Sequence, residues 1–414
     1  MSLELVLTVL VGFIMAWAVG ANDVANAMAS TVGSKTLSVR TAVIVAAVFE
    51  AIGAICASGQ VTNMIRYGII DVQVFSNQLD HFVVGMLSAL MSAASWLLIA
   101  THFGWPVSTT HSIIGAVLGF GVVSIGMSHI LWWSVAKILL SWVLTPLCAV
   151  FVSYFTFILI GRLIFSAKDP IAQANWLIPT CMMLLVFIFS GVTIFQGLDV
   201  IGIEMDAWKR QVLIVSMGGV SFVIGWLYTH KKLKKTKKLS REKQLNAVEK
   251  KFAILSIMTA ASMAYAHGSN DVANAIGPVA AVVQVLQTQS LTEGSVIPTW
   301  VVFLGASGIV LGLMMYGYKI METVGSGITQ LTPSRGFTAQ FSTSAMIVVA
   351  SGLGYPVSTT QTMVGSILGV GLARGMTALN LNTIKSILVS WSITVPVGAI
   401  FAGVYYWVLS FFLL

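Results

Sequence analysis

Long apolar runs dominate the chain, and polar residues are confined to short breaks between them. Many runs reach the roughly 17–25 residues that a helix needs to cross a bilayer, and they lack the alternation over ~10 residues that marks a membrane β-strand. The pattern predicts an all-α integral membrane protein with about 12 helical elements, some too short to span fully. These elements lie near residues 3–19, 41–59, 82–101, 112–128, 130–165 (long enough for two), 176–197, 211–229, 252–266, 296–318, 341–353, 359–373 and 384–414.

Composition supports the membrane class and adds an orientation. Of the 414 residues, 57% are hydrophobic and only 9% are charged, whereas a soluble domain carries about 25% charged residues. The net charge of +8 is concentrated in residues 230–251, which hold ten Lys/Arg and two Glu, while the rest of the chain is balanced. A basic loop of this kind stays on the cytoplasmic side. We interpret it as a topology signal and expect no nucleic-acid partner.

Three motifs occur twice, in the same order and at nearly constant spacing. "GANDVANA" from Gly20 returns as "GSNDVANA" from Gly268, an offset of 248 residues. "PVSTTHSIIGAVLGFG" from Pro106 returns as "PVSTTQTMVGSILGVG" from Pro356, an offset of 250, and "LLSWVLTPL" is echoed by "LVSWSITVP". Many transporters are duplicated in this way and bind substrate near the midplane, where discontinuous helices of the two repeats meet. The predicted divisions are an N-terminal repeat at 1–165, connecting transmembrane helices at 166–229, the basic loop at 230–251 and a C-terminal repeat at 252–414.

The doubled "PVSTT" motif has the features of a helix start. Proline and the residue before it interrupt a preceding helix, and Ser or Thr then caps the next one. Each motif therefore predicts a half-helix that begins at membrane depth, with free N–H groups and a positive dipole end that attract an anion. Close helix packing at small hydroxyl residues is the alternative explanation. Two such starts would hold a small tetrahedral oxyanion through Ser108, Thr109, Thr110, Ser358, Thr359 and Thr360.

The doubled "NDVANA" motif predicts a cation site in each half. On a helix, residues three and four apart share a face, so each aspartate lies beside two asparagines. Such oxygen ligands suit a hard cation, and a charge at this depth indicates function. Bound cations would cancel carboxylates that otherwise repel the anion, which predicts symport; an Asp that only caps a broken helix is the alternative. The predicted ligands are Asn22, Asp23, Asn26, Asn270, Asp271 and Asn274.

Two further polar residues are candidates for coupling. Glu50 lies inside the apolar run "AVIVAAVFEAIGAICASG", and it could bind a cation, carry a proton or be a neutral structural group. His111 follows the first "PVSTT", where Gln361 follows the second. We interpret His111 as an orienting hydrogen-bond partner rather than a proton relay.

The doubled motifs resemble those of the PiT-type inorganic phosphate transporter family, also called sodium/phosphate symporters or phosphate permeases. "VTNMIRYGII" from Val61 and "LTPSRGFTAQFSTSAMIVVAS" from Leu331 are similar to further family segments, so the resemblance covers nearly the whole chain. It implies two inverted repeats, re-entrant hairpins, a homodimer and termini on the outer face of the cell's inner membrane. It also implies phosphate at the six hydroxyl residues, Na+ at the two Asn-Asp sets, and no cofactor or enzymatic activity.

The sequence departs from the family pattern at two positions. Gln361 replaces a histidine that often follows the second "PVSTT", and Gln340 stands where many sodium-coupled relatives have glutamate. The second departure leaves proton coupling open, although both intact "NDVANA" motifs favour sodium. Sulfate permeases of the same family are a further alternative for the substrate. An intramembrane aspartyl protease is a remote one, because each aspartate here is accompanied by two asparagines.

Overall fold

The computed structural model describes residues 2–103, 105, 107–197, 203, 205–233, 240–292, 294–317, 332–375 and 381–414, apart from the side chains of 24–26, 29, 196–197, 231–233 and 381–388. These ranges are almost entirely helical and contain one isolated β-bridge, between Ile70 and Ile130. The predicted all-α membrane fold is confirmed, because eight of the described helices are long and apolar enough to span a bilayer. The first-half helices are α1 (Leu3–Asn22), α2 (Val24–Gly33), α3 (Val39–Ala57), α4 (Gly59–Tyr67), α5 (Leu79–Phe103), α6 (Thr109–Ile125) and α7 (Trp132–Ile160). They are followed by α8 (Pro170–Val192), α10 (Ala207–Leu233), α11 (Arg241–Thr288), α12 (Thr299–Gly312), α14 (Pro333–Gly352), α15 (Thr359–Arg374) and α16 (Leu381–Leu413).

Two helices are longer than the sequence pattern suggested. The run at 130–165 forms one membrane span, because α7 continues through Pro146 into a π-helical turn at Gly161–Phe165 instead of dividing in two. Helix α11 has 48 residues and passes through the predicted element at 252–266. At about 1.5 Å per residue it is about 72 Å long, more than twice the ~30 Å hydrocarbon core. Both ends of the predicted loop at 230–251 are helical, because α10 continues to Leu233 and α11 begins at Arg241.

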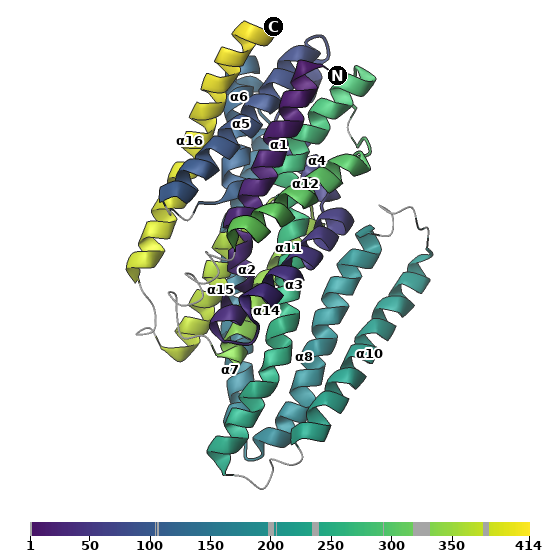
Figure 1. Cartoon of the computed structure of the whole chain (residues 1–414), viewed down its shortest axis with the longest axis vertical. Coiled ribbons are helices and arrows are strands. Elements are labelled where there is room, and N and C mark those ends of the chain that lie inside the picture. The colour runs from purple at the N-terminus through teal and green to yellow at the C-terminus, as the bar shows by residue number, and fades with distance from the viewer. Residues whose placement is uncertain are drawn as a thin grey trace.

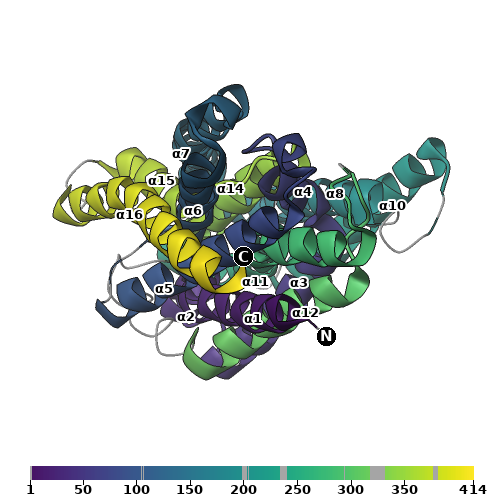
Figure 2. The same cartoon turned by 90° about the horizontal axis from the view of Figure 1, so that it is seen from above.

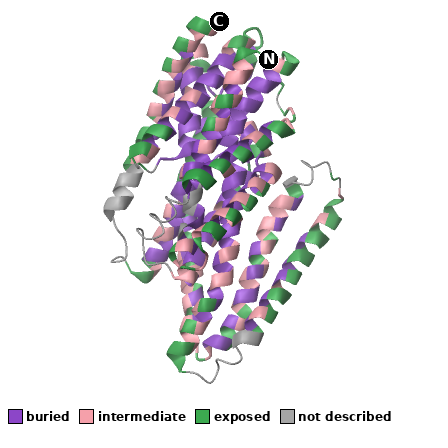
Figure 3. Ribbon diagram, in the orientation of Figure 1, coloured by how far each residue is buried: buried purple, intermediate pink, exposed green. Residues whose placement is uncertain are grey.

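The chain termini and the two described helix ends of the basic segment lie at opposite ends of the molecule. Figure 1 shows the N- and C-termini together at one end, with the end of α10 and the start of α11 at the other. Helices α8 and α10 pack against each other at one side, where Figure 2 shows α10 at the edge of the bundle. Buried residues are concentrated in the bundle that α1, α5, α6 and α11 form, as Figure 3 shows.

The two halves exchange packing partners in a reciprocal way. Helix α6 packs along α16 and α15 packs along α7, while α1 packs along α12 and α11 along α3. Glycines allow these close approaches at matching positions. A Cβ placed on Gly115 would lie 2.5 Å from the carbonyl oxygen of Val395, and one placed on Gly365 would lie 2.5 Å from that of Pro146. The duplicated sequence is thus accompanied by duplicated contacts, and the helices that follow the two "PVSTT" motifs occupy equivalent environments.

Candidate functional site

The two Ser-Thr-Thr motifs begin helices inside the protein, as the sequence predicts. Ser108 is the N-cap of α6, and its hydroxyl accepts a hydrogen bond of 3.3 Å from the backbone N–H of His111. Ser358 caps α15 in the same way and accepts one of 3.3 Å from the N–H of Gln361. The first turn of each helix has backbone N–H groups without intrahelical partners and the positive end of the dipole. The hydroxyl residues are all buried: Ser108, Thr109, Thr110, Ser358, Thr359 and Thr360.

Asn270, on α11, fixes the turn that precedes α15. Its side-chain N–H donates to the carbonyl oxygen of Val357 at 2.7 Å, and its side-chain oxygen accepts from the N–H of Val357 at 3.2 Å and from the Ser351 hydroxyl at 3.3 Å. The hydroxyl of Thr110 donates to the same Val357 carbonyl at 3.1 Å. The buried backbone of the turn is therefore satisfied by side chains from other elements. The side-chain N–H and the side-chain oxygen of Asn270 thus both bind the turn that precedes α15.

Helix α11 also connects the two helix starts. The side-chain N–H of Asn274 lies 3.3 Å from the hydroxyl oxygens of both Thr109 and Thr110 on α6. The hydroxyl of Thr359 on α15 donates to an Asp271 carboxylate oxygen at 2.9 Å. The predicted anion ligands of both halves thus contact the predicted cation ligands of the second half. The side-chain oxygen of Asn274 is buried without a hydrogen-bond partner, so it remains available as a ligand.

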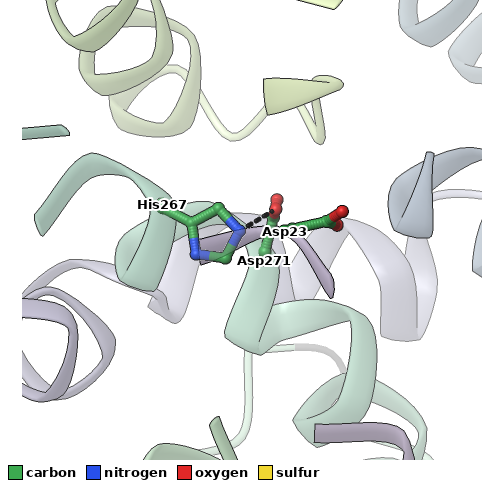
Figure 4. Close-up of side chains that lie close together, drawn as sticks. All are labelled: Asp23, His267 and Asp271. Atoms are coloured by element: carbon green, nitrogen blue, oxygen red, sulfur yellow. Dashed lines mark ion pairs between the residues drawn. The ribbon is translucent and has the colours of Figure 1, made fainter. Parts of the chain in front are cut away.

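A cluster of carboxylates surrounds His267, which lies one helical turn before Asp271 on α11. One ring nitrogen of His267 lies 2.8 Å from an Asp271 oxygen, and the other lies 2.8 Å from an oxygen of Glu50 on α3. Asp23 joins the group at the junction of α1 and α2, so that one ligand atom from each of Asp23, His267 and Asp271 lies within 4.8 Å of the others. Figure 4 shows the Asp23 and Asp271 carboxyl groups on the same side of the imidazole.

This cluster carries more acid than its own groups can neutralise. The four side chains are at most 3% exposed, so water does not screen them and each uncompensated charge is costly. Three carboxylates face one imidazole, which carries at most a single positive charge. Stable burial therefore requires bound cations or protons. The donors fit this requirement, since one oxygen of Asp23 and the free oxygen of Asn274 are buried hard ligands without a hydrogen bond.

His267 was not among the residues predicted from the sequence. It precedes the second "NDVANA" by three residues, whereas Val19 stands at the same offset of 248 in the first half. Glu50 likewise has no acidic counterpart. Helix α11 meets α3 where Gly268 faces Glu50, and α1 meets α12 in the equivalent way where Gly20 faces Ile309, so an isoleucine stands in the place of the acid. The pair of His267 and Glu50 is therefore present at only one of the two equivalent contacts between the halves, that of α11 with α3. A polar residue on the cation-ligand face, four positions before Asp271, was the signal that could have identified it.

The remaining predicted residues fall into three groups. Asn22 ends α1 beside Asp23, and the side chain of Asn26 lies outside the described residues. Gln340 on α14 is buried, donates to the carbonyl oxygen of Ala27 at 2.7 Å and accepts from the Thr259 hydroxyl at 3.1 Å, so it joins α14 to α2 and α11. His111 does not join the acidic cluster. Its ring stacks on Trp142, with ring centres 3.8 Å apart.

Comparison with known proteins identifies the family to which this sequence and fold belong. The sequence pattern of the phosphate transporter family matches residues 19–402. A protein of Haemophilus influenzae named as a phosphate permease is 45% identical over 404 residues, which are 97% of this chain and 96% of the relative. A chloroplastic inorganic phosphate transporter of Arabidopsis thaliana is 38% identical over 97% of this chain and 72% of its own length.

A solved structure supports the same assignment. The structure of a sodium-dependent phosphate transporter superposes with a TM-score of 0.93 at 38% identity, covering 99% of this chain and 100% of that one. The resemblance inferred from the doubled motifs is thereby confirmed, and with it a multi-pass membrane protein that is a transporter and not an enzyme. By its sequence and by its fold, this chain belongs to the phosphate transporter family.

Proposed function

We propose that the protein imports inorganic phosphate across the inner (plasma) membrane by symport with a cation, with Na+ favoured, through alternating access. The observation that carries this proposal is that α11 joins the starts of α6 and α15 to the buried carboxylates, through Asn274 on one side and Asp271 on the other. An anion site and an acidic cluster in direct contact repel each other unless cations are bound. Phosphate binding then depends on cation binding, which is the thermodynamic requirement for coupled transport.

The proposed phosphate ligands are the hydroxyls and free N–H groups of the two Ser-Thr-Thr helix starts. Ser108 and Ser358 cap their helices and orient the first turns, so the proposed donors to the oxyanion are the free backbone N–H groups of these turns and the Thr360 hydroxyl. The hydroxyls of Thr109, Thr110 and Thr359, which already bond to other groups, would line the site and accept from a protonated phosphate oxygen. A protonated phosphate can also donate to a hydroxyl, while sulfate is an acceptor only. Sulfate sites can also be built from neutral hydroxyls, so the preference for phosphate rests on the family, and sulfate stays as the alternative substrate that the transport assay below must test.

The proposed sodium ligands are the two Asn-Asp sets, with Asp23 and Asp271 supplying the charge. Carboxylate and amide oxygens are the ligands that hard cations prefer. The solved relative is called sodium-dependent, which supports Na+ as the co-transported ion. The contacts of Asn270 with Val357 leave it a positioning role for the α15 turn in addition.

Proton coupling is the second candidate, and His267 is the observation that favours it. An imidazole between two carboxylates, at 2.8 Å from each, is well placed to hold a proton. Gln340 cannot supply a carboxylate to a cation, and it already joins α14 to α2 and α11. A coupling proton would then be shared among Glu50, His267 and Asp271.

The orientation and assembly are part of the proposal. The basic segment is assigned to the cytoplasm and both termini to the outer face, which agrees with their location at opposite ends of the bundle (Figure 1). The reciprocal packing of α6 with α16 and of α15 with α7 supports two inverted repeats, at 1–165 and 252–414, that move against each other. A homodimer is proposed from the family resemblance.

The deciding experiment is labelled-phosphate uptake into proteoliposomes that contain only this protein. An inward sodium gradient at equal pH, or a pH gradient without sodium, is imposed while sulfate is offered as a competitor. Uptake driven by sodium and insensitive to sulfate supports the full proposal. Uptake driven by the pH gradient alone replaces sodium with the proton, and strong competition together with transport of labelled sulfate would refute the phosphate assignment.

A further inference from the structure

A cavity lies behind the two helix starts, between α7 and α16, with α15 as a further wall. Its volume is about 760 Å³, and its wall is mostly apolar, with Trp142, Val143 and Leu147 on α7 and Trp391 and Val395 on α16. None of its lining residues is Lys, Arg, Asp or Glu. This α7–α16 cavity is therefore unsuited to phosphate or a cation. It shares no lining residue with the acidic cluster of Asp23, Glu50, His267 and Asp271.

The cavity opens toward the bilayer. On α7, Leu139, Val143 and Leu147 line it and are each about half exposed. Both α7 and α16 are apolar enough to cross the membrane, so this exposed face meets hydrocarbon rather than water. Any occupant of the cavity consequently enters from the lipid phase, and most of its surface must be apolar.

The inner end of the cavity is polar and incompletely hydrogen-bonded. The side-chain oxygen of Gln361 and the indole N–H of Trp391 are buried there without a well-formed hydrogen bond, and the His111 ring lies beside the Gln361 side chain and the Trp391 backbone without well-formed geometry to either. Buried polar groups in proteins are rarely left in this state, and a cluster of them calls for a ligand or water that supplies the missing bonds. Trp391 can only donate, Gln361 offers an acceptor, and His111 can do either.

We infer that the α7–α16 cavity binds a long-chain fatty acid from the bilayer, with its carboxyl group at the inner end. A neutral carboxyl group combines an acceptor for Trp391 and a donor for Gln361 in one small planar group, and it adds no charge to an uncharged wall. The acyl chain then follows the apolar side chains of α7 outward. A phospholipid headgroup is excluded, because its charged phosphate would be buried without a cationic partner.

The location gives this ligand a route to transport, and this step rests on the proposed function. His111 and Gln361 directly follow Thr110 and Thr360 in the first turns of α6 and α15. The cavity is also bounded by α6 and α7 from the first half and by α15 and α16 from the second, so a bound chain resists any movement that brings α7 and α16 together. Fatty acid binding is accordingly expected to inhibit uptake.

Binding is tested by photolabelling of the protein in proteoliposomes with palmitic acid that carries a diazirine in its chain. We expect adducts on α7 and α16 that fall about tenfold when unlabelled palmitic acid is added in about tenfold excess, by simple mass action. Adducts on the lipid-facing Phe155, which is 63% exposed, are expected to remain. Adducts that no competitor removes would indicate bulk lipid only and would overturn the site.

Variants test the geometry without altering the proposed transport site. Val143→Phe fills the cavity mouth and is expected to abolish the competed adducts, while Leu144→Phe, an exposed neighbour outside the cavity, is the matched control and retains them. Trp391→Phe removes the indole donor and is expected to weaken competition by palmitic acid about tenfold.

Methyl palmitate, which has no O–H group, should compete poorly; equal competition by the ester would overturn the carboxyl assignment. Disulfide cross-linking between copies of a Val143→Cys variant, without fatty acid adducts, would assign the cavity to a second copy instead.

The functional arm compares phosphate uptake with and without palmitic acid. Inhibition in the wild type that disappears in Val143→Phe supports the inhibitory role, and equal inhibition in both would overturn it. Because labelling needs no transport, its result is independent of the proposed function. If the protein shows no phosphate uptake but palmitic acid still competes with the photolabel, only the transport proposal is contradicted.

Discussion

Replacement of Asp271 by asparagine is the most direct test of the coupling between cations and phosphate. The carboxylate accepts the hydroxyl of Thr359 at 2.9 Å and lies 2.8 Å from His267. Asparagine has nearly the same shape and keeps an acceptor for Thr359, so Asp271→Asn removes one negative charge and little else. The helix starts should keep their positions, and the loss should fall on cation binding.

The magnitude follows from the burial of the site. Asp271 is fully buried, and a unit charge about 4 Å from a cation contributes about 4 kcal/mol at an effective dielectric constant of about 20. Because about 1.4 kcal/mol corresponds to a factor of ten, the half-saturating sodium concentration should rise up to about 1000-fold. At ordinary sodium concentrations, coupled phosphate uptake would then be lost.

The assay is phosphate uptake into proteoliposomes as a function of the sodium gradient, with expression and thermal unfolding measured in parallel. Asp206→Asn is the matched control, since that carboxylate is about 59% exposed in a surface ion pair with Lys209. The control should behave as the wild type does. A half-saturating sodium concentration of Asp271→Asn equal to that of the control would refute the role of this carboxylate in cation binding.

Three further substitutions test other parts of the site. Thr359→Val removes a buried hydroxyl and its hydrogen bond, so the half-saturating phosphate concentration should rise about tenfold in a phosphate titration; an unchanged value would exclude Thr359 from the anion site. Asn270→Ala leaves the N–H of Val357 unsatisfied and removes one of the two donors to its carbonyl oxygen, so it should destabilise the fold by about 1–3 kcal/mol, measured as a lower midpoint of thermal unfolding in detergent; a wild-type midpoint would contradict the proposed positioning role. Gly365→Leu places a side chain against the backbone of Pro146 and should greatly reduce the folded yield, whereas Gly191→Leu, with open space around its Cβ position, should not; equal yields would contradict the close packing of α15 on α7.

The sequence alone was sufficient to predict the membrane-spanning helices and the two helix starts, because these depend on residues that are close together in the chain. The apolar runs predicted the spanning helices, and proline followed by serine predicted the starts of α6 and α15, because capping depends on residues a few positions apart. The duplication also predicted that both halves contribute to one site. The contacts of Thr110 and Asn270 with Val357 agree with that expectation.

Long-range packing decided the features that the sequence did not reveal. Pro146 and Pro278 lie inside continuous helices, because the surrounding bundle supports a backbone that a proline would interrupt in isolation. Asn270 is predicted as a cation ligand, and its amide also satisfies the backbone of a turn that is distant in the sequence, a contact that the sequence does not reveal. His267 was missed because its charge partner Glu50 lies on another helix, and repeats reveal only what both halves share.

The pair of His267 and Glu50, which has no equivalent in the repeat, also implies that the two "NDVANA" motifs do not form independent cation sites. Two copies of "NDVANA" suggest two equivalent sites, but Asp23 and Asp271 converge on the single His267, and only the contact of α11 with α3 adds a further acid, at Glu50. The equivalent contact of α1 with α12 has Val19 and Ile309 in place of His267 and Glu50, so it offers no charged side chain at these positions. A cation bound at either aspartate therefore changes the field at the other, and by thermodynamic reciprocity the two affinities must depend on each other. In the proposed cycle the cations load as a coupled set, so that phosphate meets a nearly neutral site only after the acidic cluster has been filled.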